Sequence, residues 1–173
     1  MENESVTIVE ADLAVPDHTR AIVALTAAYA CDALGNGAAL PEDVLQRLVA
    51  GLAAHPTTMV LLASVGRQFV GIATCFVGFS TFAARPIINV HDLYVAESAR
   101  GRGVGRGLLA AVEAIARQRG CAKLTLEVQE MNHRARHLYE AVGFAQAVYS
   151  PENGGALFYA KSLEPANADT GGG

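Results

Sequence analysis

The spacing of apolar residues changes several times along the chain, and each change marks a predicted element. Between residues 44 and 52, apolar side chains recur at the spacing of a helix that packs one face. Residues 58–65 and 69–80 are instead continuous apolar runs joined by Gly66 and Arg67, which predicts a hairpin of two buried strands. Helical spacing returns between Val104 and Arg119.

Taken together, these patterns predict the order β-α-α-β-β-β-α-β-α-β-β. The strands are expected over residues 5–11, 58–65, 69–80, 87–95, 122–128, 144–150 and 155–163, and the helices over 17–34, 40–56, 104–119 and 132–143. One β-α-β crossover lies between antiparallel hairpins, so we expect a single α/β domain over residues 1–165 with a mixed, mostly antiparallel sheet. The small polar residues of 166–173 predict a disordered tail.

Composition narrows the class of protein. With 51% hydrophobic residues in 173, the chain has ample apolar surface for one core. The net charge of −4 argues against a general nucleic-acid binder, and no apolar run approaches the roughly 20 residues of a membrane span. The acidic start "MENESVTIVE" differs from a signal peptide, so we expect a soluble, cytoplasmic protein. Cys31, Cys75 and Cys121 are expected to be small buried residues.

The stretch "YVAESARGRGVGRGLL" concentrates glycine and arginine between a predicted strand and a predicted helix. A helix N-terminus exposes unpaired N–H groups, glycines let an anion approach the backbone, and arginine binds phosphate oxygens. We therefore expect a pyrophosphate site here. A P-loop is excluded because no Lys in this stretch is followed by Ser or Thr, and the G-x-G-x-x-G spacing of a dinucleotide fold is not met.

Two linked motifs resemble the GNAT superfamily of N-acetyltransferases. "RGRGVG", from Arg100 to Gly105, matches that family's Arg/Gln-x-x-Gly-x-Gly/Ala pattern. "NHRARHLYEAVGF", from Asn132 to Phe144, is similar to its N-x-x-A-x-x-L-Y-x-x-x-G-F segment, and "HDLYV" looks like its fourth strand. The resemblance is close over residues 89–144 and rests on element order upstream.

The resemblance implies a GNAT fold, with about seven strands, about four helices and a sheet splayed between its fourth and fifth strands. Acetyl-CoA is the implied cofactor, with its pantetheine arm in the gap. Free strand edges there can pair with an amide-bearing ligand. The implied cofactor-binding residues are Leu93, Tyr94, Val95, Arg100, Gly101, Arg102, Gly103, Val104, Gly105, Arg106, Asn132 and Tyr139.

Tyr139 is the proton donor to the departing thiolate that the resemblance implies. It follows Asn132 by about two helical turns, so both side chains should face the same way. Asn132 can cap its helix, bind the cofactor, or do both.

The reaction also needs a base that removes a proton from the acceptor amine, and the sequence does not single out one residue for this role. Strict alternation along residues 87–95 would place Asn89, His91, Leu93 and Val95 on one face of the strand. His91 stands where many relatives carry Glu, so either His91 or a water chain could be the base. Asp92 could anchor the amine or act only as a structural acceptor.

Other polar residues are assigned weaker roles. His133 and His137 have the spacing of zinc ligands, but no third ligand suggests itself and we expect no metal site. Arg134 or Arg136 could instead meet the ribose phosphate of coenzyme A.

The resemblance implies that the acceptor is a primary amine of a small molecule or peptide. The segments expected to wall it, residues 32–43 and 78–86, are small and neutral and give no sign of a polyamine site. A non-catalytic acyl-CoA-binding or sensing module on the same fold is the alternative. The resemblance also leaves a homodimer open.

Overall fold

In a computed structural model, the chain forms an open sheet covered by helices on both faces; residues 5–35, 37–150, 154–155 and 159–161 are described. The main sheet has the order β1-β2-β3-β4-β5. Its strands are β1 (Val6–Glu10), β2 (Thr58–Val65), β3 (Gln68–Ser80), β4 (Arg85–Val95) and β5 (Leu124–Leu126). Neighbouring strands are antiparallel, except that β4 and β5 are parallel.

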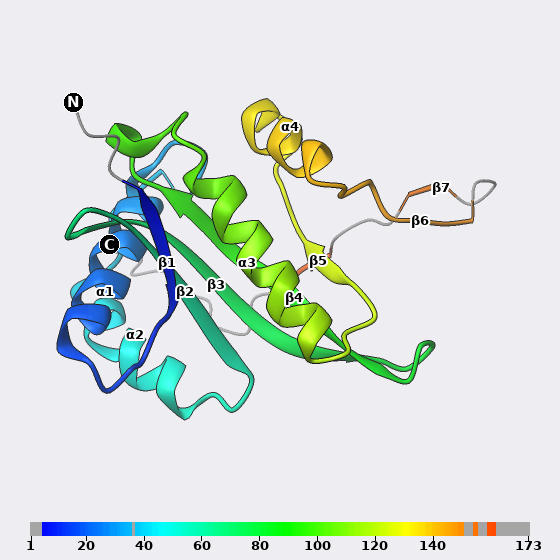
Figure 1. Cartoon of the computed structure of the whole chain (residues 1–173), viewed down its shortest axis with the longest axis horizontal. Coiled ribbons are helices and arrows are strands. Elements are labelled where there is room, and N and C mark those ends of the chain that lie inside the picture. Colours follow the sequence, from blue (N-terminus) through cyan, green and yellow to red (C-terminus); the bar gives the residue numbers. More distant parts are fainter. Residues whose placement is uncertain (1–4, 36, 151–153, 156–158, 162–173) are drawn as a thin grey trace, which may run out of the picture.

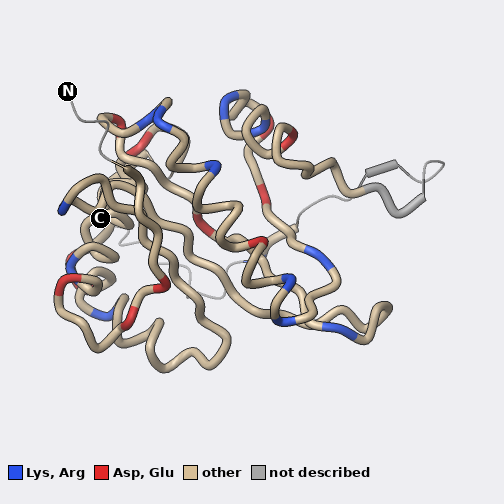
Figure 2. Tube along the Cα trace, viewed as in Figure 1, with Lys and Arg blue, Asp and Glu red and all other residues tan. Residues whose placement is uncertain are grey.

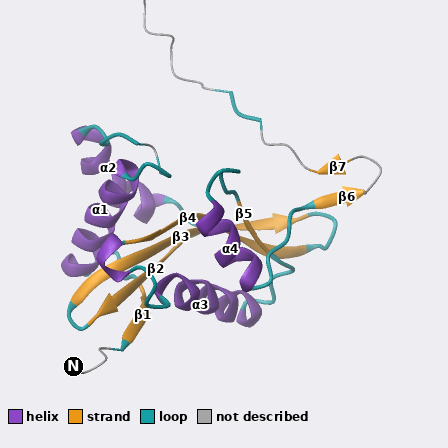
Figure 3. Ribbon diagram, turned by 90° about the horizontal axis from the view of Figure 1, so that it is seen from above, coloured by secondary structure: helices purple, strands orange, loops and turns teal. Residues whose placement is uncertain are grey.

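The described helices lie in two layers (Figures 1 and 3). On one face lie α1 (Pro16–Cys31) and α2 (Glu42–Ala54), and on the other lies α3 (Val104–Gln118), with α4 (His133–Ala141) near the end of the sheet. A short 3-10 turn, η1 (Glu97–Ala99), follows β4. The predicted element order and α/β class are confirmed.

Two hydrophobic clusters explain why β2 and β3 read as continuous apolar runs. Along β2, Val60 and Leu62 pack in the cluster under α1 and α2, whereas Met59 and Leu61 pack in the cluster under α3. Because successive side chains of a strand point to opposite faces, a strand covered on both sides needs apolar residues at every position.

The predicted sheet of about seven strands is wrong in its count. Strands β6 (Val148–Ser150) and β7 (Gly154–Gly155) pair with each other as a separate two-stranded sheet and extend away from the main one (Figure 1). Most of the final predicted strand, and the predicted tail over 166–173, lie outside the described residues.

Other boundaries also differ from the predictions. The first helix ends at Cys31 rather than at residue 34, and the strand predicted over 122–128 keeps only Leu124–Leu126. Of the cysteines, Cys75 is buried as expected and Cys121 is half-buried, but Cys31 is exposed. No helix in the described ranges is long and apolar enough to cross a bilayer.

Candidate active site

Strands β4 and β5 run together for a short distance and then part. Their pairing covers only Ile88 with Leu124, Asn89 with Thr125, and Val90 with Leu126. Beyond Val90, the edge of β4 that faces β5 has no strand partner among the described residues, although its other edge stays paired with β3 as far as Val95. The separation opens a pocket of about 740 Å³.

The pocket collects nearly all the residues that the sequence proposed for the site. His91 to Val95, Arg100, Gly101, Gly103 to Arg106, Asn132 and Tyr139 line it. Arg102 is exposed and is not among the lining residues. Its side chain is therefore the one member of the predicted set that the structure does not bring into the pocket.

The glycine-rich loop presents backbone N–H groups at the start of α3. Gly103 is the N-cap of α3, and its φ of 81° lies in the left-handed region that favours glycine. Within the described residues, the N–H groups of Val104, Gly105 and Arg106 donate to no protein acceptor. These groups and the positive end of the helix macrodipole form a ready site for an anion.

Arg100 ties this loop to the end of α1. Its Nη2 lies 2.5 Å from Oδ2 of Asp32, and its Nε donates to the carbonyl of Val95 at 3.0 Å. The guanidinium also lies 6.0 Å from the centroid of the Tyr94 ring. The arginine thus joins segments that are 68 residues apart in the sequence.

Asp32 is held in its charged form by this arrangement. Its Oδ1 accepts a hydrogen bond from the N–H of Leu34 at 2.9 Å. That bond, followed by the bond from Arg100, lowers the pKa of Asp32, and the charge of Arg134 acts in the same direction.

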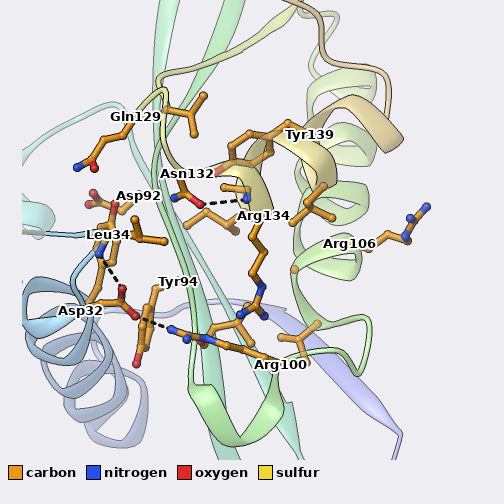
Figure 4. A pocket seen from close by; sticks show the side chains of 18 of the residues that line it. Asp32, Leu34, Asp92, Tyr94, Arg100, Arg106, Gln129, Asn132, Arg134 and Tyr139 are labelled. Atoms are coloured by element: carbon orange, nitrogen blue, oxygen red, sulfur yellow. Dashed lines mark hydrogen bonds and ion pairs between the residues drawn. The ribbon is translucent and has the colours of Figure 1, made fainter.

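Basic residues lie both in the loop before α3 and in α4 (Figure 2). Arg134 extends from α4 toward Arg100, whereas Arg106 points away from the other labelled side chains (Figure 4). No described acid forms an ion pair with Arg134. Two converging guanidinium groups beside free backbone donors suit a ligand with several phosphates.

A β-bulge in β4 changes the faces that strict alternation predicted. Cys75 of β3 pairs with Val90 and Thr74 pairs with Asp92, so His91 is an extra residue in β4. As a result, Leu93 and Val95 pack in the cluster under α3 together with Val90. The ring of His91 instead packs against the ring of Phe76, with 5.5 Å between the ring centroids. The prediction that His91 shares a face with Leu93 and Val95 is therefore wrong.

The bulge brings two proton-binding side chains into the pocket side by side. Asp92 is half-buried, and burial raises the pKa of its carboxyl while the neighbouring His91 opposes that rise. A carboxylate with a raised pKa is a better proton acceptor than an exposed aspartate.

Helix α4 supplies the remaining polar residues. Oδ1 of Asn132 accepts a hydrogen bond from the N–H of Ala135 at 3.1 Å, so Asn132 caps the helix and also lines the pocket (Figure 4). Burial, with a smaller contribution from Tyr29, raises the pKa of Tyr139 to about 12. Tyr139 therefore keeps its proton at neutral pH and has one to donate.

Sequence reasoning missed several lining residues. Tyr29, from α1, lines the pocket with its ring 5.8 Å from that of Tyr94, whereas Leu34, which also lines it, lies in the segment 32–43 that was expected to wall the acceptor site. Glu127, Val128 and Gln129 line the pocket from the chain that leaves β5. Gln129 donates a 3.4 Å hydrogen bond to the carbonyl of Gly35. These residues follow an ordinary helix or strand pattern, so nothing local to them marks a pocket.

The sheet, with its parted parallel strands and a glycine-rich helix entrance beside the gap, is a GNAT-type α/β fold. The sequence model of the acetyltransferase (GNAT) family matches residues 24–144, and the chain belongs to this family, a class of acyltransferase enzymes. A solved probable acetyltransferase shares the fold, with a TM-score of 0.74 at 20% identity over 94% of this chain and 99% of its own.

Curated relatives match the chain over shorter stretches. The uncharacterized N-acetyltransferase YhfO of Bacillus subtilis (strain 168) is 34% identical over 89 residues, which are 51% of this chain and 60% of that protein. The thialysine N-epsilon-acetyltransferase of Bos taurus is 36% identical over 78 residues, 45% of each chain. The chain thus spans about half the length of these relatives.

Proposed function

We propose that the protein is an N-acetyltransferase that moves an acetyl group from acetyl-CoA to a primary amine of a small molecule or peptide. The observation that carries the proposal is a single pocket holding a free strand edge, unpaired helix N–H groups, a proton donor and a proton acceptor. The names of the relatives, as N-acetyltransferases, support the reaction type.

The donor set fits coenzyme A. The N–H groups of Val104, Gly105 and Arg106 would hold the pyrophosphate, with Arg100 and Arg134 close to the phosphate on the ribose. The free edge of β4 from Leu93 to Val95 would pair with the amides of the pantetheine arm, which would lie between β4 and β5. Acetyl-CoA supplies the reactive thioester and leaves as free coenzyme A.

The amine must lose a proton before it can attack the thioester carbonyl. An aliphatic amine has a reference pKa of about 10.4 and is mostly protonated at neutral pH. Asp92 and His91 are next to each other in the pocket, and either can accept that proton directly or through water. The neutral amine attacks the carbonyl, so that a carbon–nitrogen bond forms and the carbon–sulfur bond breaks. Tyr139 would give its hydroxyl proton to the sulfur, and the excess proton on the acetylated nitrogen would restore the hydroxyl.

The remaining sequence predictions stay proposals of the same account. They are a single domain over 1–165, a cytoplasmic location, and a homodimer, which sedimentation of the purified chain would test.

A panel of primary amines tests the function. The chain is incubated with acetyl-CoA and one amine at a time, and free thiol is followed with a colorimetric reagent. We expect thiol release above the amine-free control with at least one acceptor. Calorimetric binding of acetyl-CoA without thiol release from any amine would contradict the proposal and favour the non-catalytic sensing module.

A further inference from the structure

A second cavity lies on the α1 and α2 face of the sheet. It is a groove of about 350 Å³ between α2 and β3. Helix α2 contributes Val44, Leu48, Gly51 and Leu52, and the groove continues to His55 and to Phe76 of β3. None of these residues stood out in the sequence as a part of the acceptor site.

Phe76 joins this groove to the active-site pocket. Its ring meets the ring of His55 edge-on at 5.1 Å and the ring of His91 edge-on at 5.5 Å. His55 lines the groove, and His91 lines the pocket. The ring of Phe76 therefore lies between the groove and the pocket, and the two cavities are adjacent.

The chemistry of the groove selects what can occupy it. Its described lining contains no carboxylate, and its basic residue Arg47 is already paired with Asp43 at 2.7 Å. Nδ1 of His55 lies 3.2 Å from Oγ1 of Thr57. The surface that remains for a ligand is apolar. It favours the binding of an alkyl or aryl group and provides no partner for a second ammonium.

Gly51 keeps the groove open. Apart from its chain neighbours and the backbone of its own helix, a Cβ built at this position meets no atom within 4 Å, so a side chain can be added there without a clash. Gly lowers helix stability relative to Ala, and no close contact of Gly51 requires it. A large side chain at this position would fill the groove without a clash at its base.

We propose that the groove binds the apolar substituent of the acceptor, so that the preferred acceptors are primary amines carrying an alkyl or aryl group. This inference rests on the proposed function and names the class of its substrate. Each methylene that enters the groove raises kcat/KM by about fourfold, because this factor corresponds to the free energy of transferring one methylene from water to an apolar surface.

Unbranched amines from ethylamine to hexylamine test the proposal in the thiol-release assay. We expect kcat/KM to rise with length, and butylamine to exceed 1,4-diaminobutane, which places a charge in the apolar groove. A flat dependence on length, or a preference for the diamine, would overturn the inference while leaving the acetyltransferase function intact.

Substitutions in α2 locate the effect. Gly51→Phe, with Gly51→Leu as a smaller filler, should lower kcat/KM for hexylamine toward the ethylamine value. The values for ethylamine and the KM for acetyl-CoA should not change. Ala50→Phe is the matched control, because Ala50 is exposed on the same helix and does not line the groove. Equal effects of the Gly51 and Ala50 variants would contradict the proposal.

Two further readouts separate the possible failures. If no amine releases thiol, the proposed function fails. Calorimetry of hexylamine binding to the wild type and to Gly51→Phe then still tests whether the groove binds the alkyl group: equal affinities would overturn that proposal. If the groove is instead the contact of a second copy, Gly51→Phe will change the sedimentation of the chain and leave the length dependence unchanged, which would also overturn it.

Discussion

Replacing Asp32 by Asn tests the link between the end of α1 and the glycine-rich loop. The change removes the charge that faces Arg100 but keeps a side-chain oxygen that can accept from the N–H of Leu34. The effect therefore reports mainly on the ion pair, and not on the turn that follows α1.

The expected loss of stability follows from the partial burial of the pair. The side chains of Arg100 and Asp32 are 27% and 21% exposed, between a surface ion pair and a buried one. Exposed pairs contribute about 0–1 kcal/mol and hydrogen bonds to charged groups about 1.5–3 kcal/mol, so we expect a loss of about 1–2 kcal/mol. For a domain of this size, each kcal/mol lowers Tm by roughly 2–4 °C.

The assay is urea unfolding of the wild type, Asp32→Asn, Arg100→Gln and the double variant, followed by circular dichroism. A double-mutant cycle should return a coupling free energy of about 1 kcal/mol. Asp43→Asn is the matched control: it breaks the pair with Arg47, whose side chains are 73% and 68% exposed, and should change stability much less.

The dependence on pH gives a second check. Because the folded state lowers the pKa of Asp32, the ion pair stabilises the fold fully above the usual aspartate pKa, and this stabilisation is lost as the pH falls through the lowered pKa of the folded state. The stabilities of the wild type and Asp32→Asn should therefore begin to converge as the pH falls below about 4. A coupling free energy within about 0.3 kcal/mol of zero at pH 7 would mean that the ion pair does not stabilise the fold.

Three further predictions concern single positions. Tyr139→Phe should lower kcat about 100-fold and affect the calorimetric Kd for acetyl-CoA much less; an unchanged kcat would contradict its role as the acid. Gly71→Ala should lower the free energy of unfolding, measured in urea, by about 1–3 kcal/mol, because its Cβ would lie 2.8 Å from Cγ1 of Val104. The control Gly78→Ala, with no contact below 3.4 Å, should lower it less. Asp92→Asn should raise Tm at pH 7 but lower kcat/KM, since burial raises the pKa of Asp92 and makes its charged form costly; a drop in Tm would count against that cause.

The local features of the fold could be predicted from the sequence. The apolar run of β2 and the start of α3 at Val104 occur where they were expected. Both depend on residues that are close in sequence: a run bounded by turn residues, and a glycine-rich segment before a helical repeat. The pyrophosphate site proposed for that loop followed from the same local information.

Features that depend on pairing between distant segments could not be predicted. The extra residue His91 is defined only by the register of β4 against β3, and a shift of one residue moves every following side chain to the other face. The pairing of Asp32 with Arg100 is likewise invisible in either segment alone. Residues 127–128 continue the strand pattern of β5, but β4 and β5 have already parted there.

A crystal structure of the chain with acetyl-CoA would show where the cofactor lies. The account predicts the pyrophosphate within hydrogen-bonding distance, about 2.7–3.2 Å, of the N–H groups of Val104 to Arg106, with the pantetheine arm between β4 and β5. A nucleotide bound outside this pocket, or β4 and β5 paired along their whole length, would contradict it.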